Sequence, residues 1–252
     1  MDAPLHGSVE PGTVVVVTGA ARGIGAELCR HLASSGAAVV AADVEQPSWD
    51  AEGLDVTHLH ADVADEASWA QLVAAVLERH GRVDALVNNA AVYAGLGSKR
   101  PFTEITVAEW DRVLAVNTRG VWLGMRAVHP AMQRQGYGRI VNMASSTVHS
   151  GVPWFAHYTA SKGAVIALTR SVAREVGTDG ITVNAIAPGL VETDASRGLN
   201  EPGYLAAAAE RRAVPRSMEP ADLAAAVSFL CSRGSGFVTG QTLVVDGGLV
   251  FS

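Results

Sequence analysis

"TVVVVTGAARGIGAELCRHLASSG", residues 13–36, joins an apolar β-branched run, a glycine-rich turn and an amphipathic stretch. The run is typical of a strand covered on both faces, and the stretch that closes at Gly36 is typical of a helix. Gly19, Gly23 and Gly25 permit a tight bend and let the backbone approach a pyrophosphate, which the helix amino terminus then faces. An ordinary glycine-rich turn is the alternative, because the spacing is G-x-x-x-G-x-G rather than G-x-G-x-x-G. Its position between strand and helix favours nucleotide binding.

Similar apolar runs recur along the chain and alternate with amphipathic stretches such as residues 65–81. The runs are "AAVVAAD" at 37, "DALVNNA" at 84, "RIVNMAS" at 139, "ITVNAIAPG" at 181 and "TLVVDGG" at 242. Strands that alternate with helices form right-handed crossovers, so we expect an α/β fold with a doubly wound parallel sheet of the Rossmann type. No repeat or linker divides the chain, which predicts a single domain over 1–252. A substrate-loop insertion at about 190–216, around a short alanine-rich helix, interrupts the alternation.

Composition excludes several classes of function. A net charge of −6 without a concentrated basic face disfavours nucleic-acid binding. No apolar run approaches the roughly 18 residues of a membrane span, and no basic segment precedes the first apolar run. We therefore expect a soluble, cytoplasmic protein without membrane contact. Two cysteines, Cys29 and Cys231, are too few for a disulfide framework or a zinc site, so we expect buried thiols and no metal.

The second apolar run ends at Asp43, eighteen residues past Gly25, where a carboxylate can bind the adenosine ribose. A cofactor 2′-phosphate there would meet a like charge, at a cost on the order of 4 kcal/mol at about 4 Å. Arg22 offsets part of this cost, but the residue after the acid is Val44 rather than a base. Asp43 therefore predicts NAD rather than NADP.

"YTASK", from Tyr158 to Lys162, places a phenol and an amine four residues apart. On a helix both side chains share one face. Taken alone, such a pair is more often found by chance on a solvated helix.

Together with "TGAARGIG", "NNAA" at 88–91, Asn117, Ser145 and the closing "VTGQTLVVDGG", this pair makes the chain resemble the classical short-chain dehydrogenase/reductase family. The resemblance spans nearly the whole chain. One departure is Ala91, where the family usually has glycine, and its methyl group is expected to tighten the turn beside the cofactor.

The resemblance implies an NAD(H)-dependent alcohol dehydrogenase or ketoreductase that acts on CH–OH groups. It assigns Tyr158 as general acid/base, Lys162 as its electrostatic partner and ribose ligand, Ser145 as anchor of the substrate oxygen, and Asn117 as holder of a proton-relay water. The residues that it assigns to the cofactor, besides Tyr158 and Lys162, are Gly19, Arg22, Gly23, Ile24, Gly25, Asp43, Asp62, Val63, Asn89, Ala90, Pro188, Gly189, Val191 and Thr193.

Each assigned role has a physical basis. Lowering the pKa of a phenol from about 10 to about 7 requires roughly 4 kcal/mol, which a nearby ammonium and an oxidised nicotinamide together supply. Ser145 follows a strand, so its hydroxyl projects from the carboxyl edge of the sheet. Asn117 lies inside a helical stretch from Thr106 to about Gln135, where an asparagine normally points outward.

The expected substrate is a hydrophobic, cyclic or aryl secondary alcohol or ketone, because the site is flanked by apolar and aromatic side chains. These are His149, Val152, Trp154, His157 and Tyr204. One alternative is a 3-oxoacyl-carrier-protein reductase, with Arg211 and Arg212 on an acidic partner, and another is a non-catalytic nucleotide-binding sensor. The resemblance implies a homotetramer assembled through the helices at 106–135 and 158–176. Val165, Leu168 and Val172 suit this interface but equally suit packing on the sheet.

Overall fold

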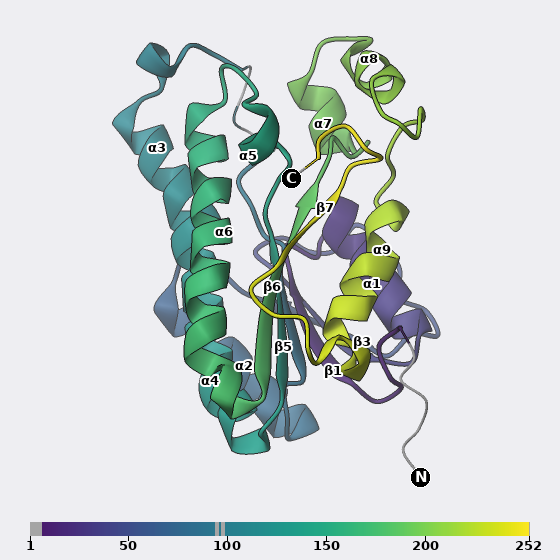
Figure 1. Cartoon of the computed structure of the whole chain (residues 1–252). Helices are drawn as coiled ribbons and strands as arrows, with labels where there is room; N and C mark the ends of the chain where they lie inside the picture. The colour runs from purple at the N-terminus through teal and green to yellow at the C-terminus, as the bar shows by residue number, and fades with distance from the viewer. Residues whose placement is uncertain (1–6, 94–95, 97–98, 252) are drawn as a thin grey trace.

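The computed structural model describes residues 7–93, 96 and 99–251. In this part of the chain seven parallel strands form one sheet in the order β3-β2-β1-β4-β5-β6-β7 (Figure 1). The strands are β1 Val14–Thr18, β2 Ala38–Asp43, β3 Val56–His60, β4 Ala85–Asn88, β5 Gly138–Met143, β6 Ile181–Pro188 and β7 Thr242–Val245. The predicted doubly wound parallel sheet is confirmed, and its strand order reverses between β1 and β4.

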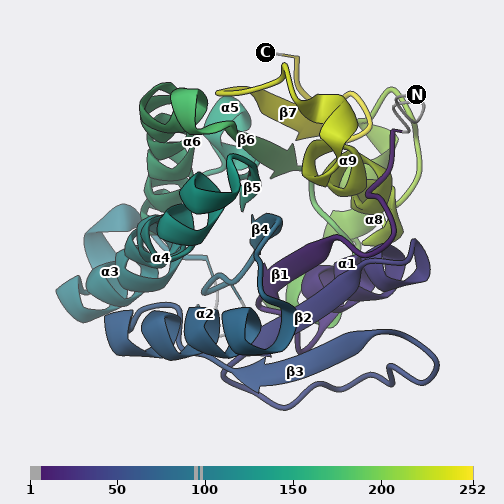
Figure 2. The same cartoon turned by 90° about the horizontal axis from the view of Figure 1, so that it is seen from below.

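Helices cover both faces of the sheet. They are α1 Gly23–Ser34, α2 Glu66–His80, α3 Val107–Leu114, α4 Gly120–Gln135, α5 Thr147–Ser150, α6 Ala156–Val176, α7 Asp194–Leu199, α8 Tyr204–Glu210 and α9 Ala221–Cys231. Four short turns complete the described elements: η1 Phe102–Glu104, η2 Ala115–Arg119, η3 Gly177–Asp179 and η4 Arg233–Ser235. The helices α2, α4 and α6 lie on one face, and α1 and α9 lie on the other (Figure 2).

The continuous apolar character of β1 follows from this double cover. Val14 and Val16 pack in the core beneath α2, α4 and α6, whereas Val15 and Val17 pack in the core beneath α1 and α9. Because successive strand residues point to opposite faces, every position of β1 is buried.

One strand, β3, has no counterpart among the predicted runs. It lies at the edge of the sheet, pairs with β2 and leaves most of its side chains partly exposed. Its sequence, "VTHLH", therefore lacks the apolar continuity of a strand that is covered on both faces.

The helix predicted over residues 65–81 is present as α2. The Asp65 carboxylate caps it by accepting hydrogen bonds from the amides of Ala67 and Ser68. Gly81 ends it in the left-handed region, at φ +71°.

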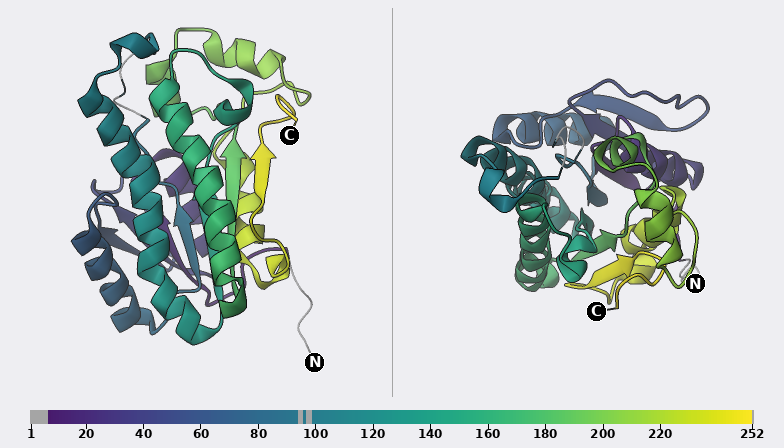
Figure 3. Two further views of the ribbon diagram at one scale, coloured as in Figure 1. Left: turned by 60° about the vertical axis from the view of Figure 1, so that its left-hand side comes forward. Right: turned by 90° about the horizontal axis from the view of Figure 1, so that it is seen from above.

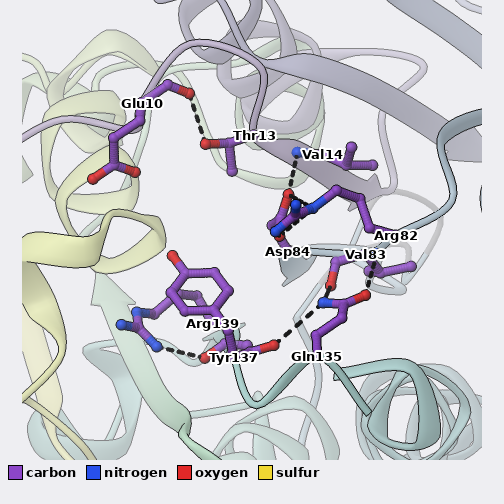
Figure 4. A network of polar contacts seen from close by, with 10 residues as sticks. Glu10, Thr13, Val14, Arg82, Val83, Asp84, Gln135, Tyr137 and Arg139 are labelled. Atoms are coloured by element: carbon purple, nitrogen blue, oxygen red, sulfur yellow. Dashed lines mark hydrogen bonds and ion pairs between the residues drawn. The ribbon is translucent and has the colours of Figure 1, made fainter. Parts of the chain in front are cut away.

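A hydrogen-bond network closes the amino edge of the sheet, opposite the ends where ligands bind in such folds (Figure 4). The Arg82 guanidinium donates to the Asp84 carboxylate at 2.8 Å, and the same carboxylate accepts the Val14 amide at 2.9 Å. Gln135 donates to the Val83 carbonyl at 2.8 Å and accepts the Val83 amide at 3.0 Å. These contacts tie together β1, the start of β4 and the end of α4.

The insertion predicted at about 190–216 lies above the carboxyl edge of the sheet, where α7 and α8 form a cover (Figure 3). The expected alanine-rich helix is α8. The preceding helix α7 was not predicted, and a capping box between Thr193 and Ser196 begins it.

Across residues 7–93, 96 and 99–251, no helix has both the length and the apolar character needed to cross a membrane. The same residues contain no group of three or more His, Cys, Asp or Glu side chains arranged to hold a metal ion.

Candidate active site

A cavity of about 1060 Å³ runs along the carboxyl edge of the sheet, between the glycine-rich turn and the α7–α8 cover. Three of the four predicted catalytic residues line it: Ser145, Tyr158 and Lys162. The remaining predicted cofactor residues line it as well: Gly19, Arg22, Gly23, Ile24, Gly25, Asp43, Asp62, Val63, Asn89, Ala90, Pro188, Gly189, Val191 and Thr193. The fourth catalytic candidate, Asn117, lies behind the cavity wall.

The glycine-rich turn keeps its backbone open to the cavity. Gly19 and Gly23 have φ values of +66° and +57°, a region that side chains disfavour. A Cβ atom on Gly25 would lie 2.0 Å from the Gly19 carbonyl oxygen. The next helix, α1, begins after Arg22 with no side-chain cap and no acidic residue in its first turn. Its amino-terminal N–H groups therefore lack a side-chain partner, which fits a bound pyrophosphate.

Asn89 and Thr18 hold this turn in place. The Asn89 amide group donates to the carbonyls of Thr18 and Gly19 at 2.9 and 3.0 Å. The Thr18 hydroxyl accepts the backbone amides of Asn89 and Ala90, both at 3.1 Å. The neighbouring Ala91 is exposed and has no left-handed φ, so the expected tightening of the turn by its methyl group is absent.

The end of the cavity that is predicted to bind adenosine carries three carboxylates, on Asp43, Glu45 and Asp62. Asp43 ends β2 and accepts the amides of Ala21 at 2.9 Å and Glu45 at 3.0 Å. The Arg22 guanidinium forms an ion pair with Glu45 at 2.7 Å. Its charge is therefore already engaged by a carboxylate.

Asp62 and Val63 follow β3 at the same end. The Asp62 carboxylate accepts the Ala64 amide at 2.8 Å, and the Val63 carbonyl accepts the buried Trp69 indole N–H at 3.0 Å. These two bonds fix the chain where it leaves the edge strand and enters α2.

Tyr158 and Lys162 lie one turn apart on α6, with 8% and 3% of their surfaces exposed. The Lys162 ammonium is 5.7 Å from the centre of the Tyr158 ring and donates to the Met143 carbonyl at 2.6 Å. Ser145 forms a hydrogen bond with Tyr158 and also accepts the Thr147 hydroxyl at 3.0 Å. The fold thus gathers a phenol, an ammonium and a hydroxyl at the end of β5.

The predicted acidification of Tyr158 combines Lys162 with the charge of an oxidised nicotinamide and stays a prediction, and in the protein without cofactor burial acts against it. Burial raises the pKa of the Tyr158 phenol well above its usual value, nearby Tyr93 raises it further, and the hydrogen bond with Ser145 opposes both. Burial also lowers the pKa of Lys162 to about 8. Loss of water around the two groups is therefore the largest cause of both shifts.

Asn117 does not point outward, as an asparagine inside a helix normally does. Between α3 and α4 the helix takes a π turn, η2, whose extra residue changes the direction of the side chains around it. Asn117 is fully buried: its oxygen accepts the Val92 amide at 2.7 Å, and its nitrogen donates to the Ser161 hydroxyl at 3.1 Å. It therefore joins the chain after β4 to α6 behind Tyr158.

The substrate end of the cavity differs from the prediction. Val152 and Tyr204 line it, whereas His149, Trp154 and His157 do not. His157 comes directly before Tyr158 on α6, so it faces another direction, toward Glu109 at 3.3 Å. Arg211 lines the cavity, but Arg212 is buried and donates to the carbonyls of Arg216 and Leu190.

Two aromatic residues that the sequence did not single out surround Tyr158. The Phe155 ring stacks on the Tyr158 ring at 4.6 Å, and the Tyr93 ring meets it edge-on at 5.4 Å. Tyr93 follows "NNAA" by two residues, which was the one available signal.

Comparisons with known proteins identify the family to which this fold and site belong. The family model for enoyl-(acyl carrier protein) reductase matches residues 19–250. Human dehydrogenase/reductase SDR family member 4 is 37% identical over 93% of this chain and 86% of its own length. The short-chain reductase protein NovJ of Streptomyces niveus is 38% identical over 98% of this chain and 97% of its own length.

Solved structures of reductases have the same fold as this chain. Levodione reductase matches with a TM-score of 0.86 and 35% identity, over 94% of this chain and 97% of its own. The 3-ketoacyl-(acyl-carrier-protein) reductase of Brucella melitensis, complexed with NADH, matches with a TM-score of 0.87 and 32% identity, over 96% and 99%. The chain therefore belongs to the short-chain dehydrogenase/reductase family of oxidoreductases, as its motifs predict.

Proposed function

We propose that the protein is an NAD-dependent oxidoreductase that interconverts a hydrophobic secondary alcohol and its ketone. The observation that carries this proposal is the cluster of Ser145, Tyr158 and Lys162 in one cavity with the glycine-rich turn. Bound nicotinamide supplies the hydride acceptor or donor. Ser145 and Tyr158 hold the substrate oxygen, and Tyr158 takes the alcohol proton or returns it to the ketone oxygen.

The pKa values of the cofactor-free site bear on this role. The phenol is protonated near neutral pH, as an ordinary tyrosine is, and burial raises its pKa further, so it holds a proton that it can donate to a ketone. Alcohol oxidation requires the phenolate, which positive charge near Tyr158 favours. Lys162 supplies one such charge at neutral pH, below its pKa of about 8. Asn117, behind Tyr158, is proposed to hold a water that relays the proton.

The Tyr158→Phe variant tests the proposed activity. Removal of the phenolic hydroxyl is expected to lower kcat by about 10²- to 10⁴-fold while NAD still binds in calorimetry. Tyr137→Phe makes the same chemical change at the opposite edge of the sheet and is the matched control. A nucleotide sensor would bind NAD in both variants and show no turnover in the unmodified protein, which would reject the enzyme.

NAD preference is proposed from the charges at the adenosine end. The Asp43 carboxylate lines the cavity, Arg22 is paired with Glu45, and the apolar Val44 is 54% exposed. A 2′-phosphate about 4 Å from Asp43 costs on the order of 4 kcal/mol at an effective dielectric of 20.

The ratio of kcat/KM for NAD to that for NADP tests this preference. The ratio should exceed about a hundredfold in the unmodified protein, allowing for solvent screening, and fall steeply in Asp43→Ser. Asp55→Asn, at an exposed acid that does not line the cavity, is the control. An NADP preference in the unmodified protein would overturn the assignment.

A second candidate is reduction of 3-oxoacyl groups on a carrier protein. Exposed Arg211 lines the cavity and suits an acidic partner. The relative from Synechocystis named 3-oxoacyl-[acyl-carrier-protein] reductase is 35% identical. The Brucella 3-ketoacyl-(acyl-carrier-protein) reductase was solved with NADH, so a preference for NAD is compatible with this candidate. A 3-oxoacyl thioester turned over faster than any aryl ketone would favour it.

A homotetramer is also proposed. Val165 is buried in the sheet core, and Leu168 and Val172 are partly buried against it. Apolar side chains on α3 and α4 remain exposed, among them Val107, Trp110 and Trp122. Light scattering at micromolar concentration should give four times the mass of the 26.1 kDa chain, and a monomer would reject the proposal.

A further inference from the structure

Lys99 extends into the substrate end of the cavity from the chain that follows β4. Its ammonium lies 4.3 Å from the centre of the Tyr204 ring and 5.8 Å from that of Phe155. It also donates to the Asn200 side-chain oxygen at 2.8 Å. The cation is thus held between the cavity floor and the α7–α8 cover, since Asn200 follows α7 and Tyr204 begins α8.

This cation is close to the proposed reaction centre. Phe155, which contacts Lys99, stacks directly on Tyr158 at 4.6 Å. A single aromatic ring therefore separates the ammonium from the phenol that is proposed to move the proton. The Tyr93 ring also meets the Tyr158 ring, at 5.4 Å, so apolar faces adjoin the phenol on the way to Lys99.

Lysine is rare in this chain. Lys99 and Lys162 are the only lysines in the sequence, in a total of 19 basic residues, and both line the cavity. Both lysines therefore belong to the same cavity.

The charge of Lys99 has no carboxylate partner among the residues that the structure describes. In contrast, the cavity-lining Arg22 pairs with Glu45, and Arg197 pairs with Glu192 and Asp194. Aromatic faces and a neutral amide attract the ammonium but leave its charge uncompensated. An anion from the substrate would supply the missing partner.

We propose that the substrate carries an anionic group, a carboxylate or a phosphate, which binds Lys99 while its hydrophobic body lies against Phe155, Tyr93 and Tyr204. This inference rests on the proposed alcohol–ketone chemistry and narrows its substrate class to hydrophobic oxo and hydroxy anions. The contact to Lys99 acts on substrate binding and is separate from the proton transfer at Tyr158.

Matched ketone pairs test the proposal. The carboxylate pairs are 4-acetylbenzoate with 4-acetylbenzamide and 4-oxo-4-phenylbutanoate with its amide. The phosphate pair is acetoacetyl-pantetheine with and without its 4′-phosphate. In the unmodified protein at least one anion should exceed its neutral partner in kcat/KM by between about tenfold and a hundredfold, mainly through KM. The preference should shrink as salt increases.

Lys99→Met should abolish this preference by lowering kcat/KM for the anion while the neutral partner changes less than about threefold, and Lys99→Arg should restore it. Arg134→Met, at an exposed position outside the cavity, is the control. If Lys99→Met lowers kcat/KM equally for both members of a pair, Lys99 only holds the α7–α8 cover and the proposal is overturned. The proposal is also overturned if the unmodified protein prefers none of the anions to its neutral partner. Turnover of neutral ketones that depends on Tyr158 would persist in either case, so the two proposals fail separately.

The scarcity of lysine also allows a direct binding measurement. Reductive ¹³C-methylation labels accessible amines, and Lys162 is buried, so the Lys99 signal can be assigned by its loss in Lys99→Arg. With NAD present, the preferred anion should shift this signal, whereas its neutral partner should not. An unshifted signal under saturating anion would contradict the contact.

Discussion

The burial of Lys162 predicts a pH dependence of stability that Lys162→Met should remove. The side chain is 3% exposed, and burial lowers its pKa from 10.5 to about 8. Below pH 8 the amine is charged in both the folded and the unfolded state, so the folded protein bears the full cost of a buried charge. Between about pH 8 and 10.5 the folded protein has lost this proton while the unfolded chain keeps it. Since the unfolded state then binds more protons, stability rises with pH across this window.

The size of the effect follows from the difference between the two pKa values. At about 1.4 kcal/mol for each pH unit, the free energy of unfolding contributed by Lys162 should rise by roughly 3 kcal/mol over the whole window. For a chain of this length that corresponds to a Tm change on the order of 5–10 °C. Lys162→Met has no proton to lose, so its profile lacks this rise.

Thermal unfolding of the cofactor-free proteins, at equal protein concentration from pH 7.5 to 10, measures the difference. The Tm of Lys162→Met should exceed that of the unmodified protein by the largest amount at pH 7.5, and this difference in Tm should shrink toward pH 10. Burial raises the pKa of Tyr158, which lowers stability above about pH 10, but this contribution is common to both proteins and cancels. Lys162→Arg keeps its charge throughout and should also lack the rise. Parallel profiles for the unmodified protein and Lys162→Met would refute the reasoning.

Three further predictions concern backbone space and buried charge. Gly25→Ala places a methyl carbon 2.0 Å from a carbonyl of its own turn, so NAD affinity in calorimetry should fall more than tenfold while the sheet stays folded by circular dichroism. In Gly124→Ala the new methyl group would lie 2.7 Å from the Trp69 ring, so the free energy of unfolding should fall by about 1–3 kcal/mol. In Gly163→Ala the nearest atom is 3.9 Å away, so the free energy of unfolding should rise by up to about 1 kcal/mol. Urea unfolding that finds Gly124→Ala more stable than Gly163→Ala would contradict this reasoning. Asp84→Ala leaves a β1 amide without its partner and should cost about 1–3 kcal/mol in the same assay without altering KM for NAD.

The residues that line the two ends of the cavity differ in how well they can be predicted from local sequence. At the cofactor end, most predicted residues lie at the end of a strand or in the segment that follows it, and the ends of parallel strands meet at one edge. Strand assignment therefore suffices to bring the glycine-rich turn, Asp43 and Asn89 together. At the substrate end, Lys99, Phe155 and Tyr204 come from three segments that are distant in sequence, and their approach depends on how the α7–α8 cover packs. His157 was predicted to flank the site because it is adjacent to Tyr158 in sequence, but its side chain faces Glu109.

Asn117 shows a second limit of local reasoning. Helical periodicity over 106–135 is correct for most of the segment, but it assumes 3.6 residues per turn throughout. The π turn at 115–119 breaks that period because buried groups of Val92 and Ser161 provide the asparagine with hydrogen-bond partners. Such partners exist only after α6 has packed against η2.

The amino-acid sequence by itself determined the parallel sheet, the family and the edge at which the site forms. An unbroken apolar run indicates a strand that is buried on both faces of the sheet, and the glycines indicate where the backbone must stay free of side chains. Only the tertiary structure decided the direction of the pKa shifts of Tyr158 and Lys162, the inward turn of Asn117 and the position of Lys99 beside Phe155. Desolvation and contact between distant segments set these features, and both depend on the whole packed chain rather than on neighbours in sequence.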